Sequence, residues 1–232
     1  MKFSLKSLAP EAPSPVGAAD SPSTWLAVEM VLLFFVLPGV LVLFRHHLRF
    51  MIMPLVLAGG ICFGVALSRH DDFDQVSFLA VRGLGRHVRD ILRVFVPAGA
   101  VMTAIAFLTD PEYFLGFPFA NPRFWLLIMV FYPVIGATLQ ETIFRGFFFH
   151  RYAGLFPDRW ILLVVNAVSF ALFHLVYWNP VALVLSFAGG LLFAWRYLRT
   201  GSLLAVTIEH GLWGDLLFTV GIGRFIFSGE IN

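Results

Sequence analysis

A chain of 232 residues with 59% hydrophobic and 13% charged side chains and a mean hydropathy of +0.85 is too apolar for a soluble domain, since such domains are about 45–50% apolar and about 25% charged. The net charge of +2 is too small to indicate a nucleic-acid partner. The single cysteine, Cys62, excludes a disulfide bond within the chain.

Residues 1–23 are polar and rich in Pro, Ala and Ser, which predicts a flexible tail. A cleaved signal peptide is not expected, because no apolar stretch directly follows the lysines of this segment. Residues 24–232 contain apolar runs long enough to cross the roughly 30 Å hydrocarbon layer of a membrane as helices. The sequence therefore predicts an all-α fold, with one transmembrane helical domain after the tail.

We expect a polytopic bundle of about seven or eight spans embedded in a lipid bilayer. The apolar runs are 24–44, 50–68, 94–109, 123–149, 160–178, 180–197 and 203–223. The polar stretch 69–93 predicts a partly amphipathic segment along the membrane surface, and residues 110–122 predict an interfacial connection rich in turn-forming and aromatic residues. Pro133 and Gly136 predict a bend in the fourth span.

The distribution of lysines and arginines predicts the orientation of the chain. With seven spans and a cytoplasmic N-terminus, and with Arg145 left out because it falls within a span, eleven lysines and arginines fall at the cytoplasmic side and four at the other side. Cytoplasmic loops are enriched in these residues. The sequence therefore predicts a multi-pass protein of the cell membrane with its N-terminus in the cytoplasm.

Ionisable side chains inside the predicted spans gather in three of the last four. A charge at the centre of a span costs about 2.5–3.5 kcal/mol on insertion scales, so it requires a partner or a function. Glu141 and Arg145 lie four residues apart on one helix face. They form either a structural ion pair or a carboxylate held charged for chemistry. Similarly, His174 is either a structural or a catalytic histidine.

The last span carries a third cluster, Glu209, His210 and Asp215. Glu209 has a structural explanation of its own, an ion pair near the helix start with Arg196 or Arg199. His210 and Asp215 lie five residues apart, so they share one face only if the helix is locally irregular, which the two neighbouring glycines would permit.

Burying polar groups from three spans costs the least free energy if these groups converge on one buried polar cavity, where they can form hydrogen bonds. We therefore expect the side chains of Glu141, His174 and His210 to approach within about 8 Å, the reach of one bridging water. A carboxylate and a histidine can deprotonate that water for attack on a carbonyl, and further polar groups can stabilise the oxyanion. This combination predicts hydrolysis inside the membrane.

At these residues the chain resembles the CAAX-protease and bacteriocin-processing (CPBP) family of intramembrane glutamic proteases. The family's E-E-x-x-x-R motif is matched by QETIFR at Glu141 and Arg145, and its F-x-x-x-H motif by Phe170 and His174. The third motif is a histidine followed four residues later by Asn or Asp, and His210 matches the histidine.

The resemblance covers about residues 120–220. The stretches FFHRY (148–152) and SFAGGLLFAWRYLRTGSLLAV (186–206) resemble a bacterial branch of the family. Some members of that branch process proteins with C-terminal sorting signals. This resemblance implies a bacterial inner or plasma membrane and a membrane-associated protein or peptide as the substrate.

The resemblance also implies a cofactor-free endopeptidase and a role for each matching residue. Glu141 and His174 activate the water, and Arg145 fixes Glu141. His210 stabilises the oxyanion, and Asp215 assists it.

Two positions depart from the family pattern. Gln140 replaces the first glutamate, which is usually taken as the catalytic base, and a glutamine cannot accept a proton at neutral pH. Either Glu141 acts as the base or the chain is a weak or inactive member. The residue four positions after His210 is Gly214, and the acidic residue, Asp215, follows one position later.

Two alternatives to the cofactor-free endopeptidase stay open. One glutamate and two histidines are acceptable zinc ligands, which allows a metalloprotease, although the helical H-E-x-x-H pattern is absent. The other alternative is a non-catalytic membrane protein, namely a scaffold, an immunity factor or a transporter whose cavity binds a solute or a proton.

Overall fold

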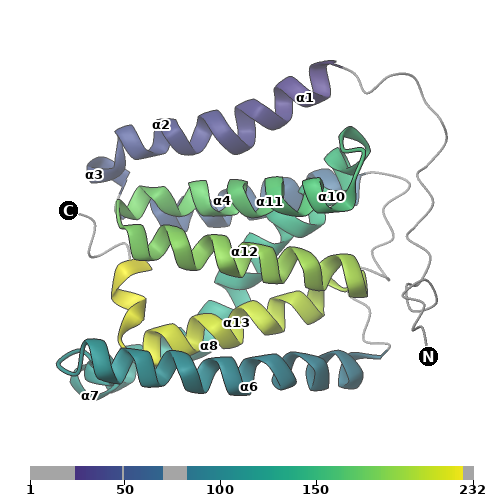
Figure 1. Cartoon of the computed structure of the whole chain (residues 1–232). Coiled ribbons are helices and arrows are strands. Elements are labelled where there is room, and N and C mark those ends of the chain that lie inside the picture. The colour runs from purple at the N-terminus through teal and green to yellow at the C-terminus, as the bar shows by residue number, and fades with distance from the viewer. Residues whose placement is uncertain (1–23, 49, 70–82, 227–232) are drawn as a thin grey trace, which may run out of the picture.

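The computed structural model describes residues 24–48, 50–69 and 83–226, and all regular elements in these ranges are helices. The predicted tail, residues 1–23, lies outside the described residues. Figure 1 shows the helices stacked side by side, most of them nearly parallel to one another. The all-α class predicted from the sequence is confirmed.

Within the described ranges, five helices are long and apolar enough to cross a membrane: Thr24–Leu43, Leu84–Thr109, Pro122–Leu155, Arg159–Tyr177 and Pro180–Thr200. Two shorter helices, α4 (Ile52–Ser68) and α13 (Leu203–Thr219), join them in the bundle. Each predicted span therefore contains a helix, and the chain is a multi-pass membrane protein.

Several of these spans combine more than one element. The first joins α1 (Thr24–Val31), the π-helical η2 (Leu32–Val36) and α2 (Leu37–Leu43). The single-element spans are α6 (Leu84–Thr109) and α12 (Pro180–Thr200), and α11 (Arg159–His174) continues into η6 (Leu175–Tyr177). The short helices α3 (Arg45–Leu48) and α7 (Gly116–Ala120) lie in connections between spans, and η7 (Ile222–Ile226) follows α13.

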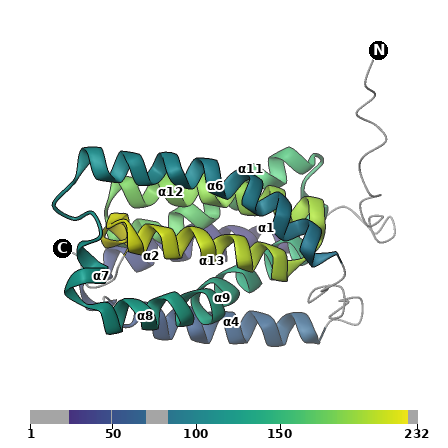
Figure 2. The ribbon, with the colours of Figure 1, turned by 90° about the horizontal axis from the view of Figure 1, so that it is seen from below.

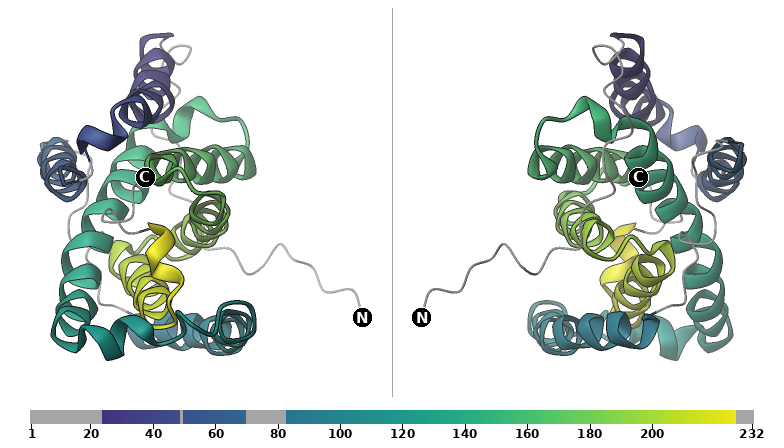
Figure 3. Two further views of the ribbon diagram at one scale, coloured as in Figure 1. Left: turned by 90° about the vertical axis from the view of Figure 1, so that its left-hand side faces the viewer. Right: turned by 90° about the vertical axis from the view of Figure 1, so that its right-hand side faces the viewer.

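The helices follow a simple spatial order. In Figure 1, α12 lies between α11 and α13, and α13 lies between α12 and α6. Figure 2 shows α4 and α6 at opposite edges of the bundle. The end-on views in Figure 3 show the span at 122–155 curving around one side of α12 and α13.

The span Pro122–Leu155 is irregular where the sequence predicts a bend. It runs through α8 (Pro122–Phe131), η3 (Tyr132–Ala137), α9 (Thr138–Glu141), η4 (Thr142–Phe147), α10 (Phe148–Tyr152) and η5 (Ala153–Leu155). Pro133 lacks a backbone N–H and cannot continue the regular α-helical ladder, and it lies with Gly136 inside η3. The second π-helical segment, η4, follows Glu141 directly and carries Arg145. Wide turns of this kind often occur at functional sites.

Capping residues explain where α12 begins and ends and where α13 begins. The side chain of Asn179 accepts a hydrogen bond from the backbone N–H of Val181 at 2.8 Å, and Pro180 occupies the first helical position of α12. Gly201 ends that helix with a left-handed φ of 62°. The hydroxyl of Ser202 then caps α13 by accepting from the backbone N–H of Ala205 at 3.2 Å.

The prediction that residues 69–93 lie along the membrane surface is wrong for the second half of this stretch. Residues 84–93 form the first turns of α6, which reaches Thr109. A helix of its 26 residues is about 39 Å long at 1.5 Å per residue, so it extends beyond the hydrocarbon layer. The N-terminal end of α6 is polar and exposed, and it carries an ion pair between Asp90 and Arg93 at 3.0 Å. Residues 70–82 lie outside the described ranges.

Glu29 in the first span shows that the ionisable side chains inside the spans are not confined to three of the last four, contrary to the prediction from the sequence. The Glu29 carboxylate in α1 accepts two hydrogen bonds from the Arg151 guanidinium, each at 2.8 Å. It accepts a third from the Tyr152 hydroxyl at 2.8 Å. These bonds join α1 to α10, and the half-buried carboxylate is fully paired by groups far along the chain.

A second ion pair joins α12 to α13 and accounts for Glu209. The Arg196 guanidinium donates from Nε to Oε2 of Glu209 at 2.7 Å and from Nη2 to Oε1 at 2.9 Å. Both residues are buried. The predicted pairing with Arg196 or Arg199 is therefore confirmed for Arg196. Glu209 lies two turns inside α13, not at the helix start as expected.

We expect the Arg196–Glu209 pair to be structural. Arg196→Met should lower the free energy of unfolding by about 3–5 kcal/mol, because the Glu209 carboxylate then stays buried without its partner. The double variant Arg196→Met/Glu209→Leu should unfold closer to the wild type, because neither charge remains to be satisfied. Denaturant unfolding of the purified protein in detergent measures both. A single variant as stable as the wild type would contradict this role.

Candidate active site

Arg145 is fully buried within the bundle and contacts Glu141, as their spacing along the helix predicts. Its Nη1 donates to Oε1 of Glu141 at 3.0 Å, and its Nη2 donates to the backbone carbonyl of Gly190 at 3.0 Å. The guanidinium also lies 4.7 Å from the ring centroid of Phe170 and 5.5 Å from that of Phe193. This one cation therefore contacts α11, α12 and its own span.

A close helix crossing makes the Gly190 carbonyl available to Arg145. A Cβ at position 190 would lie 3.0 Å from Cα of Ala167 and 3.2 Å from its carbonyl oxygen. Any larger residue would require the backbone of Ala167 to shift, so glycine allows α11 and α12 to approach closely at this point. The crossing places the carbonyl within hydrogen-bond distance of Nη2, which a wider spacing would prevent.

His210 lies at the centre of a hydrogen-bonded chain. Its Nδ1 lies 2.7 Å from Oε1 of Glu141, and its Nε2 lies 3.0 Å from the hydroxyl of Tyr132. The imidazole stacks on Phe193 with ring centroids 4.6 Å apart. A carboxylate only accepts, so Nδ1 carries a proton that it donates to Glu141. The contact expected between Glu141 and His210 is confirmed.

Two glycines of α13 allow Tyr132 to reach His210. A Cβ at Gly211 would lie 2.8 Å from Cβ of Pro133, and a Cβ at Gly214 would overlap the ring of Tyr132. The sequence suggested that these glycines allow an irregular turn, but α13 is a regular α-helix throughout. Their role is close packing against η3, so His210 and Asp215 do not share a tight face.

His174 ends α11 and has a fixed tautomer. Its Nδ1 lies 2.9 Å from the backbone carbonyl of Phe170. A carbonyl oxygen only accepts, so Nδ1 carries the proton and donates it. In a neutral imidazole, Nε2 then carries a lone pair and can accept a proton. The ring packs on Phe170, with centroids 4.7 Å apart.

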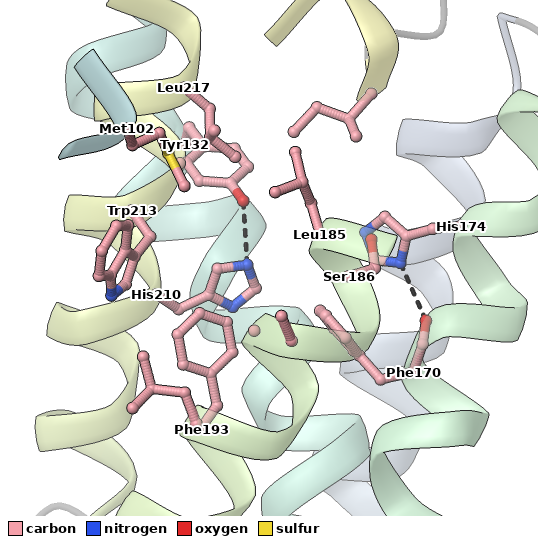
Figure 4. A pocket seen from close by; sticks show the side chains of 15 residues that line it. Met102, Tyr132, Phe170, His174, Leu185, Ser186, Phe193, His210, Trp213 and Leu217 are labelled. Carbon is pink, nitrogen blue, oxygen red and sulfur yellow. Dashed lines mark hydrogen bonds between the residues drawn. The ribbon is translucent and has the colours of Figure 1, made fainter. Parts of the chain in front are cut away.

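His174 and His210 line the same cavity, which has a volume of about 170 Å³. Figure 4 shows the two imidazoles pointing into it from opposite sides, with Tyr132 beside His210 and Ser186 beside His174. Most of the remaining lining is apolar, including Phe170, Phe193 and Leu217.

A second cavity of about 280 Å³ lies on the other side of the same residues. It is lined by Tyr132, His174 and Gln140, together with apolar side chains of α2 and α4. The Gln140 amide donates to the backbone carbonyl of Gly136 at 3.2 Å. The glutamine that departs from the family motif therefore faces a cavity together with His174.

Three expected site residues, Glu141, Arg145 and Asp215, line neither cavity. Glu141 is fully buried, is absent from the lining of either cavity and contacts His210 from behind. Its Oε1 accepts from Arg145 and contacts His210, whereas its buried Oε2 has no hydrogen-bond partner among the described residues. The expected contact between Glu141 and a water beside His174 therefore stays a prediction. Asp215 also lines neither cavity, and its buried Oδ1 has no hydrogen-bond partner among the described residues.

Tyr132 lines the cavity and contacts His210, although the sequence does not predict it as a site residue. A tyrosine inside a span, directly before a proline, was a possible signal, since buried tyrosine hydroxyls usually find a polar partner. No spacing rule pairs it with His210, which lies 78 residues away. Within the described ranges, no three His, Cys, Asp or Glu side chains are grouped so that they could hold a metal ion.

Comparison with known proteins agrees with the geometry. Residues 122–214 match the model of a family described as Rce1-like, type II CAAX prenyl endopeptidase. Neither the curated proteins nor the solved structures contain a match to the chain. The matched range begins at α8 and ends at Gly214, so it includes Glu141, Arg145, His174 and His210 but stops before Asp215.

Arg145→Lys should destabilise the fold, although it keeps the charge. A lysine ammonium is a compact donor that cannot bridge the Glu141 carboxylate and the Gly190 carbonyl as the planar guanidinium does. We expect a loss of about 1–3 kcal/mol, the cost of one buried group left unsatisfied. Thermal unfolding in detergent measures it, with Arg89→Lys on the exposed part of α6 as the matched control. Equal stability of the two variants would contradict the bridging role.

Proposed function

We propose that this chain, which carries a Rce1-like core of the CPBP family over residues 122–214, is an intramembrane endopeptidase. It would hydrolyse a peptide bond of a membrane-associated protein. The observation that carries the proposal is the pair of imidazoles, His174 and His210, which face one cavity inside the matched range, each with Nδ1 fixed by an acceptor.

His174 is best suited to activate the water. Because Nδ1 donates to Phe170, its Nε2 can take a proton from a water in the cavity. Gln140 lines only the second cavity, which His174 also lines, so it can hydrogen-bond the water only where that water lies between the two cavities beside His174. Its amide cannot take the proton. Attack of the resulting hydroxide on the substrate carbonyl forms a tetrahedral oxyanion. The proton held by His174 then passes to the leaving amine.

His210 lies across the cavity from His174, where the oxyanion would form. Glu141 holds the imidazole by accepting from Nδ1, and Arg145 holds Glu141. We therefore assign Glu141 a positioning role in place of the water-activating role expected from the sequence. Asp215 receives no role, because it does not reach either cavity.

The cavity lies toward the helix ends at Tyr177 and Thr219, since His174 and Leu217 both line it. With a cytoplasmic N-terminus, as the lysine and arginine distribution predicts, these ends face the non-cytoplasmic side. In the cell membrane of a bacterium, which the sequence resemblance implies, the substrate would approach from that side within the bilayer.

The proposal predicts cleavage that depends on His174. The full chain is reconstituted in vesicles of phosphatidylethanolamine and phosphatidylglycerol with quenched fluorescent peptides. One peptide set ends in a farnesylated CAAX sequence, and the other ends in an unmodified apolar helix followed by arginines. At least one set should be cleaved. His174→Ala should lower turnover by about 10²–10⁴, the usual contribution of a general base, whereas His87→Ala on α6 should not.

Two outcomes would contradict this function. Absence of cleavage in both peptide sets would favour the non-catalytic alternative, which Gln140 makes the strongest competitor. Cleavage by His174→Ala at the wild-type rate would remove the proposed base. Loss of cleavage in a zinc chelator, with recovery on added zinc, would instead support the metalloprotease alternative.

Gln140→Glu should raise turnover. The side chain at position 140 lines the second cavity with His174, so a carboxylate there would add a proton acceptor beside the water. We expect an increase of at least about tenfold, within the range of general-base contributions. Gln140→Met keeps the length of the side chain without its polar atoms and serves as the control. A Glu variant no faster than the wild type would show that this position does not reach the water.

A further inference from the structure

The position of Tyr132 points to a catalytic role that the sequence pattern does not reveal. We infer that its phenol donates a hydrogen bond to the oxyanion of the tetrahedral intermediate. In this role it replaces the polar residue that the family motif has four positions after His210. The inference rests on the proposed endopeptidase activity, and it requires no covalent bond between the phenol and the substrate.

The first support is steric. Position 214 holds a glycine where the family has Asn or Asp, and the space in front of it is occupied by Tyr132. A Cβ at Gly214 would lie 2.6 Å from Cζ and 2.8 Å from the hydroxyl oxygen of that ring. The phenol hydroxyl therefore lies where a polar side chain at position 214 would project. Glycine at 214 and tyrosine at 132 are sterically matched.

The second support is the hydrogen-bonded chain that ends at the phenol. The Tyr132 hydroxyl contacts Nε2 of His210 at 3.0 Å, Nδ1 contacts Glu141 at 2.7 Å, and Arg145 donates to Glu141 at 3.0 Å. When the imidazole is neutral, the phenol donates to Nε2. When the imidazole carries both protons, Nε2–H donates to the phenol oxygen, and the phenol proton is free to turn toward the cavity.

The third support is the location of the hydroxyl. Tyr132 lines the cavity between His174 and His210, and it also lines the second cavity beside Gln140. A carbonyl attacked by a water on His174 would develop its negative charge toward the opposite wall, where Tyr132 and His210 lie (Figure 4). A donor in such an apolar environment stabilises charge more strongly than it would in water.

A purely structural role would not require the hydroxyl. The Tyr132 ring packs edge-on against Phe218 with centroids 5.5 Å apart, and it fills the space in front of Gly214. Phenylalanine would make the same ring contacts. The hydroxyl adds a polar group to a partly buried position, and its hydrogen bond is directed to the same His210 that contacts Glu141.

The direct test compares Tyr132→Phe with the wild type, using whichever peptide set the reconstituted wild type cleaves. The variant should lose about 10²–10³ in kcat, the usual effect of one oxyanion donor. Its KM and its thermal unfolding midpoint should change little, because the ring contacts remain. Tyr113→Phe removes a phenol hydroxyl outside the cavities and should keep full activity.

A rescue experiment separates donation from packing. Tyr132→Ala empties the space in front of position 214, and Tyr132→Ala/Gly214→Asn returns an amide donor to it. The double variant should cleave at least about tenfold faster than Tyr132→Ala/Gly214→Ala, which fills part of the space without a donor.

Each outcome bears on a different claim. Wild-type kcat in Tyr132→Phe would overturn the role of the phenol and leave the proposed function standing. Equal rates in the two double variants would also overturn it, because space alone would then explain the effect. A wild type that cleaves neither peptide set would contradict the proposed function, and the inference would fall with it.

Discussion

The buried guanidinium of Arg145 is the constraint on which the site depends. A charged side chain inside a membrane bundle requires compensation from neighbouring groups, and Arg145 obtains it from the Glu141 carboxylate, the Gly190 carbonyl and the faces of two phenylalanine rings. The carboxylate that compensates Arg145 then orients His210. A single electrostatic requirement therefore fixes the spacing of three helices and the orientation of one imidazole in the cavity.

Glycines that allow close helix packing bring the polar groups of different spans together at the site. Gly190 brings α12 against α11, and Gly211 and Gly214 bring α13 against the irregular segment at Pro133. Without a hydrophobic driving force between helices in lipid, small residues that permit close packing determine which helix faces meet. The result is an apolar cavity whose few polar groups come from separate spans. This is the arrangement expected of a site that must exclude bulk water but retain one reactive molecule.

The sequence predicted the helices well because long apolar runs have few alternatives in a bilayer. It also predicted the Glu141–Arg145 contact, which follows from helical spacing within one span. Contacts between distant spans could not be predicted in this way. The contacts of Glu29 with Arg151 and of Tyr132 with His210 depend on how the helices pack. For the same reason the sequence placed Glu141 in the cavity, whereas the structure places it behind His210.

The central claim is that Glu141 acts through His210 and does not contact the attacking water. A double-mutant cycle on kcat with Glu141→Gln and His210→Ala tests it most directly. If the claim is correct, Glu141→Gln slows the wild type by at least about tenfold but adds no further loss once His210 is alanine, since residues that act as a unit are strongly non-additive. Losses that multiply in the double variant would show that Glu141 acts independently of His210 and would contradict the account.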